Sequence, residues 1–338
     1  MSIDKSKRHT LTMLGSLALS PLFPRIGHGA IPALRGATMG TTYRIHIAEA
    51  PDKVDLPKLK RQIETILETT ESSMSTYRPD SEISRLNLSS DTRWQPLSMD
   101  IERVLTAALN ISVKSGGVFS PVVGPLVEHW GFGPKINHYP DFSDEVPATI
   151  TEAVDHNNLQ LSTGKLLKTR SDTALDLNAI AKGDAIDQLG LALNGDGINN
   201  YLIEVGGEVL TAGKGPDGTG WNVGVESPSG DVNQGVRLVN KAIATSGDYT
   251  DYFIRHGKRY CHLIDPRSGY PVTHGLAAVS VIADHAIDAD AWATALLIMG
   301  PKDGPVFARD NAMPALFVRR ENSGYPTSMT PQFKSFLI

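Results

Sequence analysis

The stretch "NYLIEVGGEVLTAG", residues 200–213, is rich in β-branched and aromatic residues and has a strand pattern. A glycine-rich turn separates it from a second strand pattern, "GWNVGVESP" at 220–228. Three more follow along the chain: "KAIATSGDYTDYF" (241–253), "KRYCHLIDP" (258–266) and "AAVSVIAD" (277–284). Such runs of strands, interrupted by only a few helices, predict an α+β fold rather than a regular alternation of parallel strands and helices.

Helices are expected where apolar residues recur at helical spacing, as Leu59, Ile63 and Leu67 do within residues 56–74. Two further helices are predicted at 99–115 and at 288–299, the second closed by Gly300-Pro301. The remaining expected elements are a strand within 36–48 that is entered through a Gly/Thr-rich turn, an irregular packed loop at 117–134, a strand at "TALDL" (173–177) that leads into a helix ending at Asn194-Gly195, and a last strand at 315–320.

Composition excludes several classes of protein. The chain has 338 residues, 41% of them hydrophobic, and a net charge of −5, so it resembles an ordinary globular protein without a basic surface for nucleic acid. Its single cysteine, Cys261, rules out an intrachain disulfide and a cysteine-based zinc site.

The N-terminus has the pattern of an export signal. The basic "KSKR" (5–8) precedes the apolar run "LTMLGSLALSPLF" (11–23), which is too short to span a bilayer, and the small residues of "GHGA" (27–30) suit cleavage. We therefore expect a signal peptide over 1–30, exported by the Sec or Tat route, and one periplasmic catalytic domain over 31–338 that does not span the membrane. The alternative is a partly buried N-terminal helix.

The segment "DADAWATAL" (288–296) carries a candidate metal site. On a helix, Asp290 and Thr294 are four residues apart and share a face. A carboxylate and a hydroxyl are hard oxygen ligands that suit Mg²⁺. Alternatively, Asp290 is a carboxylate favoured near a helix start and Thr294 is an ordinary half-buried residue.

The segment "LDLNAIAKGD" (175–184) carries a candidate anion site. Asp176 ends the predicted strand, and Lys182 lies in the first turns of the helix that follows. A helix N-terminus presents free N–H groups to anions, and Lys182 adds a positive charge beside them. The alternative is a solvated lysine on an amphipathic helix.

Glycine-rich backbone occurs at "TMGTTY", "EVGGEV" and "ATSGDY", where it permits close approach to a flat or phosphorylated ligand. The dinucleotide-binding pattern Gly-x-Gly-x-x-Gly is absent in its required context, as are the serine-hydrolase elbow and the zinc-protease pattern. A Rossmann site, serine hydrolysis and zinc proteolysis therefore lose support.

The segment "CHLIDPRSGYPV" (261–272) contains His262, a candidate for proton transfer. Pro266 and Gly269 favour a sharp turn just after His262. Histidine titrates near neutral pH, so His262 is a candidate proton carrier, and the alternative is a structural histidine beside a turn.

Taken together, these segments resemble the ApbE-type FAD:protein FMN transferases, a likeness that covers essentially the whole chain after the expected signal peptide. The matching segments occur in order: "ATMGTTY" (37–43), "MSTYRPDSEISRLN" (74–87), "GPLVEHWGFGP" (124–134), "LDLNAIAKG" (175–183), "EVGGEV" (204–209), "ATSGDY" (244–249), "HLIDPRSGYPV" (262–272) and "DADAWATAL" (288–296).

The resemblance implies an ApbE-like α+β fold with mixed or antiparallel sheets, flanking helices and a deep FAD cleft. It also implies Mg²⁺-dependent transfer of FMN from FAD to a Ser or Thr hydroxyl of a partner protein, with release of AMP. The metal ligands would be Asp290, Thr294 and the backbone carbonyl of Ala179. The FAD-binding residues would be Met39, Tyr77, Ser120, Asp176, Lys182, His262 and Ile264.

The catalytic residues that we expect for this chemistry are His262 and Asp290. His262 would be the general base or would orient the acceptor hydroxyl, with Asp290 or Asp288 as alternative proton acceptors. One departure concerns Ser120 in "FSPVVGP", where the family usually has Asp, so this position keeps a polar oxygen but loses the charge.

Two other functions use the same cleft: an FAD pyrophosphatase that releases FMN and AMP, and a non-catalytic flavin-binding or flavin-delivery protein. The family's acceptors are flavin-carrying subunits of membrane redox complexes, which makes such a subunit the expected partner.

Overall fold

A computed structural model describes residues 33–49, 54–134 and 144–338, so the expected signal peptide over 1–30 lies outside the described residues. The main sheet has eight strands in the order β1-β2-β6-β7-β10-β15-β16-β17, and every neighbouring pair is antiparallel. The predicted α+β class is confirmed. The strands are β1 (Ala33–Thr38), β2 (Thr41–Glu49), β6 (Asn200–Val205), β7 (Glu208–Ala212), β10 (Ala242–Gly247), β15 (Leu276–Ala283), β16 (Ala315–Arg319) and β17 (Thr327–Met329).

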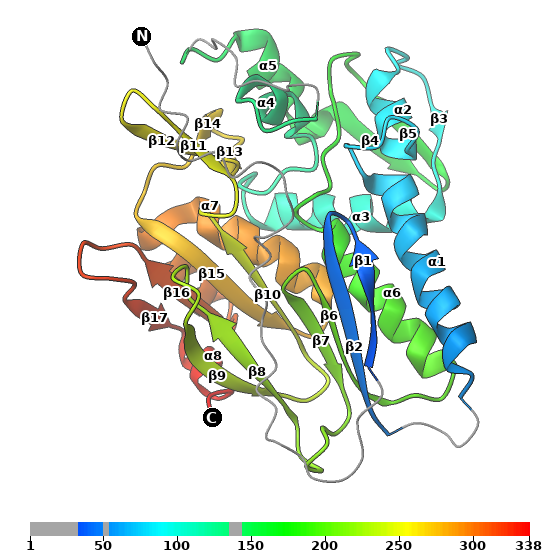
Figure 1. Cartoon of the computed structure of the whole chain (residues 1–338). Helices are drawn as coiled ribbons and strands as arrows, with labels where there is room; N and C mark the ends of the chain where they lie inside the picture. Colours follow the sequence, from blue (N-terminus) through cyan, green and yellow to red (C-terminus); the bar gives the residue numbers. More distant parts are fainter. Residues whose placement is uncertain (1–32, 50–53, 135–143) are drawn as a thin grey trace.

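Both faces of this sheet are covered, because successive side chains of a strand point to opposite faces. On β6, Ile203 packs in a core with α1 and α6, whereas its neighbour Leu202 packs in a core with the β8–β9 hairpin and α8. In Figure 1, α6 and α7 lie behind the sheet, α1 lies beside it next to β1, and the hairpin lies in front. The bounds are α1 (Leu56–Met74), α3 (Met99–Lys114), α6 (Ala181–Gly195), α7 (Ala286–Asp310), β8 (Trp221–Glu226), β9 (Val232–Leu238) and α8 (Pro331–Lys334).

Smaller elements gather beyond one end of the sheet, at the top of Figure 1. They include a three-stranded sheet and two short hairpins, β11–β12 and β13–β14. Their bounds are α2 (Glu82–Leu88), β3 (Gln95–Pro96), α4 (Gly124–His129), α5 (Ala148–Ala153), a 3₁₀ turn (His156–Asn158), β4 (Leu159–Ser162), β5 (Lys165–Lys168), β11 (Tyr252–Arg255), β12 (Lys258–Cys261), β13 (Ile264–Asp265) and β14 (Tyr270–Pro271).

The predicted helices are present. The helix expected at 56–74 is α1 with the same bounds, and Asp55 caps it by accepting a hydrogen bond from the N–H of Lys58. At the predicted stop, Gly300 has φ of 83°, which interrupts α7, but helical structure resumes and continues to Asp310. The expected end at Gly300-Pro301 is therefore a break within a longer element.

The predicted strand at 173–177 is wrong. This segment has no regular secondary structure, and its backbone groups pair with a side chain and a loop instead of a neighbouring strand. The side chain of Asn87 accepts from the N–H of Leu175 and donates to its carbonyl, and the N–H of Asp176 donates to the carbonyl of Pro121.

Three other strand predictions needed division. The pattern at 241–253 contains β10 and the start of β11, and the pattern at 258–266 contains β12 and β13. The pattern at 200–213 is two strands, β6 and β7, because Gly206 and Gly207 both have positive φ and reverse the chain. At 36–48 the predicted turn lies at Met39-Gly40 and leads into β2 as expected, whereas the residues before the turn belong to the end of β1. The segment 117–134, expected to be irregular, includes the short helix α4.

Within the residues that the structure describes, no helix combines the length and apolarity needed to cross a bilayer.

Helices α6 and α7 cross at Gly183. A Cβ atom at this position would lie 2.4 Å from the carbonyl oxygen of Ala286 and 2.6 Å from Cα of Ile287. Only glycine lets the backbones approach this closely, and the approach brings the first turn of α6 to the buried side of α7.

We expect Gly183→Ala to destabilise the fold by about 1–3 kcal/mol, because the new methyl group meets backbone that cannot move aside cheaply. Gly195→Ala is the matched control, since it lies at the other end of α6 with open space around it, and it should be neutral or stabilising by up to about 1 kcal/mol. Urea unfolding of both variants measures the difference. Equal stability of the two would show that the crossing is not tightly packed.

Candidate active site

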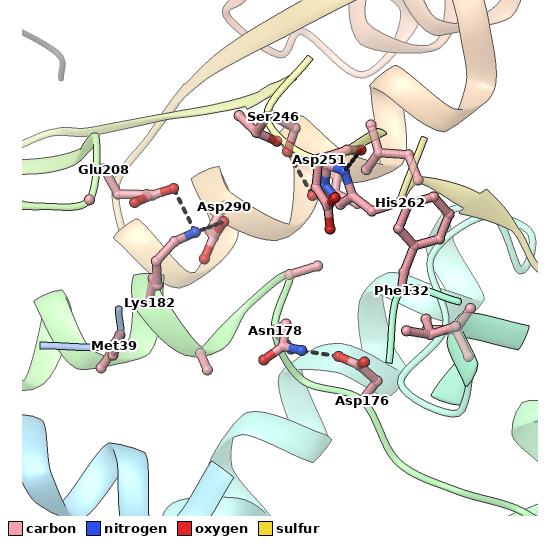
Figure 2. Close-up of a pocket in the computed structure, with 18 of the residues that line it drawn as sticks. Met39, Phe132, Asp176, Asn178, Lys182, Glu208, Ser246, Asp251, His262 and Asp290 are labelled. Atoms are coloured by element: carbon pink, nitrogen blue, oxygen red, sulfur yellow. Dashed lines mark hydrogen bonds and ion pairs between the residues drawn. The ribbon is translucent and has the colours of Figure 1, made fainter. Parts of the chain in front are cut away.

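A cavity of about 790 Å³ lies between the sheet, α7 and the smaller elements. Figure 2 shows part of its lining, drawn from segments far apart in the sequence. All ten residues predicted for binding, metal coordination or catalysis line it: Met39, Tyr77, Ser120, Asp176, Ala179, Lys182, His262, Ile264, Asp290 and Thr294. Asp288, the alternative proton acceptor, is not among its lining residues.

Asp290 and Thr294 lie on successive turns of α7, and both are buried, with 4% and 8% of their surface exposed. Asp290 does not cap the helix: α7 begins at Ala286, and the Asp290 carboxylate accepts a hydrogen bond of 3.0 Å from the N–H of Gly183. The Thr294 hydroxyl is 2.7 Å from that of Ser246 on β10. Both oxygens belong to the cavity wall, as the metal prediction requires.

The carbonyl of Ala179 is the third oxygen predicted to bind metal. It precedes α6, and the N–H of Gly183, four residues later, is directed to Asp290 rather than back to this carbonyl. Among the described residues, no three His, Cys, Asp or Glu side chains gather as a metal site. The predicted set contains only one such side chain, and its carboxylate, hydroxyl and carbonyl oxygens have the chemistry that Mg²⁺ binds.

Lys182 lies between two buried carboxylates (Figure 2). Its ammonium is 2.8 Å from Oε1 of Glu208 and 3.9 Å from Oδ1 of Asp290. The alternative of a solvated lysine is therefore wrong. Burial opposes the charge on Lys182, but the Asp290 and Glu208 carboxylates outweigh it and raise the pKa of the ammonium.

Glu208, the first residue of β7, was not predicted as a residue of the site. Burial raises the pKa of its carboxyl to about 7, although Lys182 acts in the opposite direction. Its Oε2 atom is buried and has no hydrogen-bond partner among the described residues. The segment "EVGGEV" attracted notice for its glycines, and the glutamate after them was the signal that could have identified this residue.

Asp176 lies on the opposite wall of the cavity from Lys182 in Figure 2. Its carboxylate accepts a hydrogen bond of 2.9 Å from the N–H of Asn178. Burial raises the pKa of Asp176 to about 6, which that hydrogen bond partly offsets. The side-chain amide of Asn178 also contacts Thr76, 3.3 Å away, and links this wall to the chain after α1.

His262 follows β12 and is held by Asp251, which precedes β11. The carbonyl of Asp251 accepts from the backbone N–H of His262 at 3.1 Å and lies 3.1 Å from Nδ1 of the ring. A carbonyl can only accept, so Nδ1 carries the hydrogen and the neutral ring keeps its lone pair on Nε2. Burial lowers the pKa of His262, with Asp251 opposing, which favours this neutral form.

The remaining predicted residues complete the walls. The Tyr77 hydroxyl donates to the carbonyl of Phe132 at 3.3 Å. The Ser120 hydroxyl accepts from the N–H of Val122 at 3.3 Å, so it partly serves the local turn. Ile264 lies on β13, and Met39 on the turn between β1 and β2.

Several polar residues of the lining were missed by the sequence analysis. Ser246 and Asn178 lie inside segments that were singled out, where glycine and lysine drew attention instead. Asp251 lies in a predicted strand pattern and Glu71 in a predicted helix, and neither was noticed as a polar residue. Only the tertiary structure shows that these four residues line the cavity.

Comparison with known proteins agrees with this geometry. The sequence pattern of the ApbE family matches residues 39–317. The FAD:protein FMN transferase of Vibrio cholerae (strain O395) is 36% identical over 90% of this chain and 92% of its own length, and that of Escherichia coli K12 is 34% identical over 91% and 90%.

Solved structures agree as well. The apo form of the Pseudomonas stutzeri flavinyl transferase ApbE superposes with a TM-score of 0.84 at 34% identity, covering 91% of this chain and 96% of that one. The flavin transferase ApbE of Vibrio cholerae gives 0.81 at 33% identity, covering 91% and 99%. Sequence and fold therefore agree over nearly the whole described chain, and the chain belongs to the ApbE family, a family of flavin transferases.

Proposed function

We propose that this protein transfers FMN from FAD to a Ser or Thr hydroxyl of an acceptor protein, forming a phosphoester and releasing AMP. One observation carries the proposal: all ten residues expected for this chemistry line the same cavity. Its volume of about 790 Å³ lies in the upper part of the range usual for small-molecule sites, as a dinucleotide requires. The names of the relatives support the same reaction.

Mg²⁺ fits this site, where Asp290, Thr294 and the Ala179 carbonyl would hold it. When bound, it would neutralise charge on the phosphates and orient them. The unpartnered oxygen of Glu208 and the pairing of one ammonium with two buried carboxylates indicate a place that accepts further positive charge.

The protein's own groups would act on the acceptor and on the pyrophosphate. The acceptor oxygen bonds to the phosphorus of the FMN half, the bond from that phosphorus to the bridging oxygen breaks, and AMP leaves with that oxygen. The hydroxyl proton passes to Nε2 of His262, the ring nitrogen with the lone pair. Lys182 supplies positive charge beside the phosphates.

Two rival functions share the cavity. A pyrophosphatase would release free FMN, and a flavin-delivery protein would bind FAD without releasing AMP. Incubation with FAD, Mg²⁺ and a candidate acceptor, followed by in-gel fluorescence of the acceptor and measurement of AMP, separates the three. A fluorescent flavin bound covalently to the acceptor, with an equimolar amount of AMP, supports transfer. Free FMN and AMP without a fluorescent acceptor support the pyrophosphatase.

We further propose that the acceptor is a flavin-carrying subunit of a membrane redox complex and that the protein works in the periplasm. The first rests on the family resemblance and the second on the signal-like pattern over residues 1–30. Mass spectrometry of a co-expressed acceptor and fractionation of cells test them.

Asp290→Asn should abolish transfer, with AMP release at least about 100-fold slower, because the amide lacks the charge that a cation requires. Asp288→Asn is the matched control: it makes the same change two residues away, outside the cavity lining, and should keep the wild-type rate. AMP release is measured over a range of Mg²⁺ concentrations. Equal rates in both variants would exclude Asp290 from the mechanism.

His262→Ala should slow transfer by about 100-fold or more, because a positioned base contributes that much to proton removal. FAD binding is measured in parallel, and the loss in rate should exceed any loss in affinity. A variant with wild-type transfer would assign the proton to another group.

The pH dependence should follow the neutral form of His262. Because burial lowers the pKa of this ring below its ordinary value of 6.5, the base stays unprotonated into mildly acidic solution. The acid limb of the transfer rate at saturating FAD is therefore expected below pH 6.5. A midpoint above 6.5 would contradict this assignment.

A further inference from the structure

The turn between β1 and β2 has an unusual backbone. Thr38 and Thr41 pair across a two-residue loop, and both central residues have positive φ, 49° at Met39 and 69° at Gly40. This is the pattern of a type I′ hairpin turn, whose first central position usually holds Asn, Asp or Gly. A methionine there is strained, since a residue with a long side chain rarely adopts this conformation.

Glu71, on the last turns of α1, holds this turn in place. Its Oε1 atom accepts a hydrogen bond of 2.7 Å from the N–H of Met39 and one of 3.0 Å from the hydroxyl of Thr38. The carboxylate therefore binds the strained residue and the one before it, across 32 positions of sequence. The helix that carries it packs in the same core as β2, so the support is rigid.

The turn forms part of the cavity wall. Met39, Gly40, Thr41 and Glu71 all line the cavity, and the neighbouring turn at Gly206-Gly207 lines it beside them. The two turns are in contact: the N–H of Gly206 donates to the carbonyl of Thr42. Strain retained at a cavity wall and supported by a specific partner points to a role in binding.

We propose that Glu71 is a positioning residue for FAD binding. It holds the Met39 turn in its strained conformation, so that the turn presents a preformed surface to the dinucleotide. This inference rests on the proposed function, because FAD is the ligand that the cavity is proposed to bind. It assigns Glu71 to affinity for FAD and not to the transfer of the phosphoryl group.

The experiment compares three substitutions on α1 by their dissociation constants for FAD, measured from the quenching of flavin fluorescence without Mg²⁺ or acceptor. Glu71→Leu removes the acceptor of both hydrogen bonds and should weaken binding about tenfold or more. Glu71→Gln keeps an oxygen that accepts both, and should stay within about threefold of the wild type. Glu64→Leu, two turns earlier and outside the cavity lining, is the control and should bind as the wild type does.

A double-mutant cycle with Met39→Gly separates positioning from direct contact. Glycine adopts positive φ without strain, so the turn no longer needs Glu71. In the Met39→Gly background, Glu71→Leu should raise the dissociation constant for FAD by less than about threefold. An equal cost in both backgrounds, or an equal loss in Glu71→Gln and Glu71→Leu, would overturn the proposal.

Two further measurements keep the test decisive. Urea unfolding shows whether Glu71→Leu folds; if it does not, Thr38→Val replaces it, because it removes one of the two donors and should weaken FAD about two- to fivefold. Wild-type protein that fails to bind FAD would reject the proposed function itself. Wild-type protein that binds and transfers, beside a Glu71→Leu variant of equal affinity, would reject only the role of Glu71.

Discussion

The hydrogen bond from the N–H of Gly183 to the buried carboxylate of Asp290 is the contact on which the rest of the site depends. It forms because glycine lets α6 approach the first turn of α7 so closely that any Cβ would meet backbone. The same approach brings Lys182 beside Asp290 and removes a helical donor from the Ala179 carbonyl. One packing constraint between two helices therefore assembles the charged end of the cavity.

Burial of the charged groups around Lys182 has a large desolvation cost. The half-buried ammonium of Lys182 lies within hydrogen-bonding or ion-pair distance of two buried carboxylates, and one oxygen of Glu208 has no partner among the described residues. Buried ion pairs contribute little net stability, because desolvation offsets their attraction. A buried carboxylate oxygen without a partner, beside a second buried carboxylate, is better explained by a ligand of positive charge, which supports the proposed Mg²⁺ site.

Local patterns were read correctly where a single element determined them. The apolar spacing of α1 gave its bounds, and Gly300 gave the interruption of α7. The segment 173–177 was misread because its alternation is typical of a strand, whereas its hydrogen bonds go to Asn87 and Pro121, which are distant in sequence. Glu71 was missed for the same reason, since nothing near it in sequence marks it as a cavity residue, whereas Glu208 lies in a segment that was noticed only for its glycines.

The sequence by itself determined the positions of the main helices, the α+β class, the ordered likeness to the ApbE family, and the residue types able to bind a metal, an anion or a proton. Only the tertiary structure decided which of these residues meet and which unpredicted partners hold them. The physical reason is range: periodicity and turn chemistry act over a few residues, whereas the bond between Gly183 and Asp290 spans 107 positions and depends on the packing of whole helices.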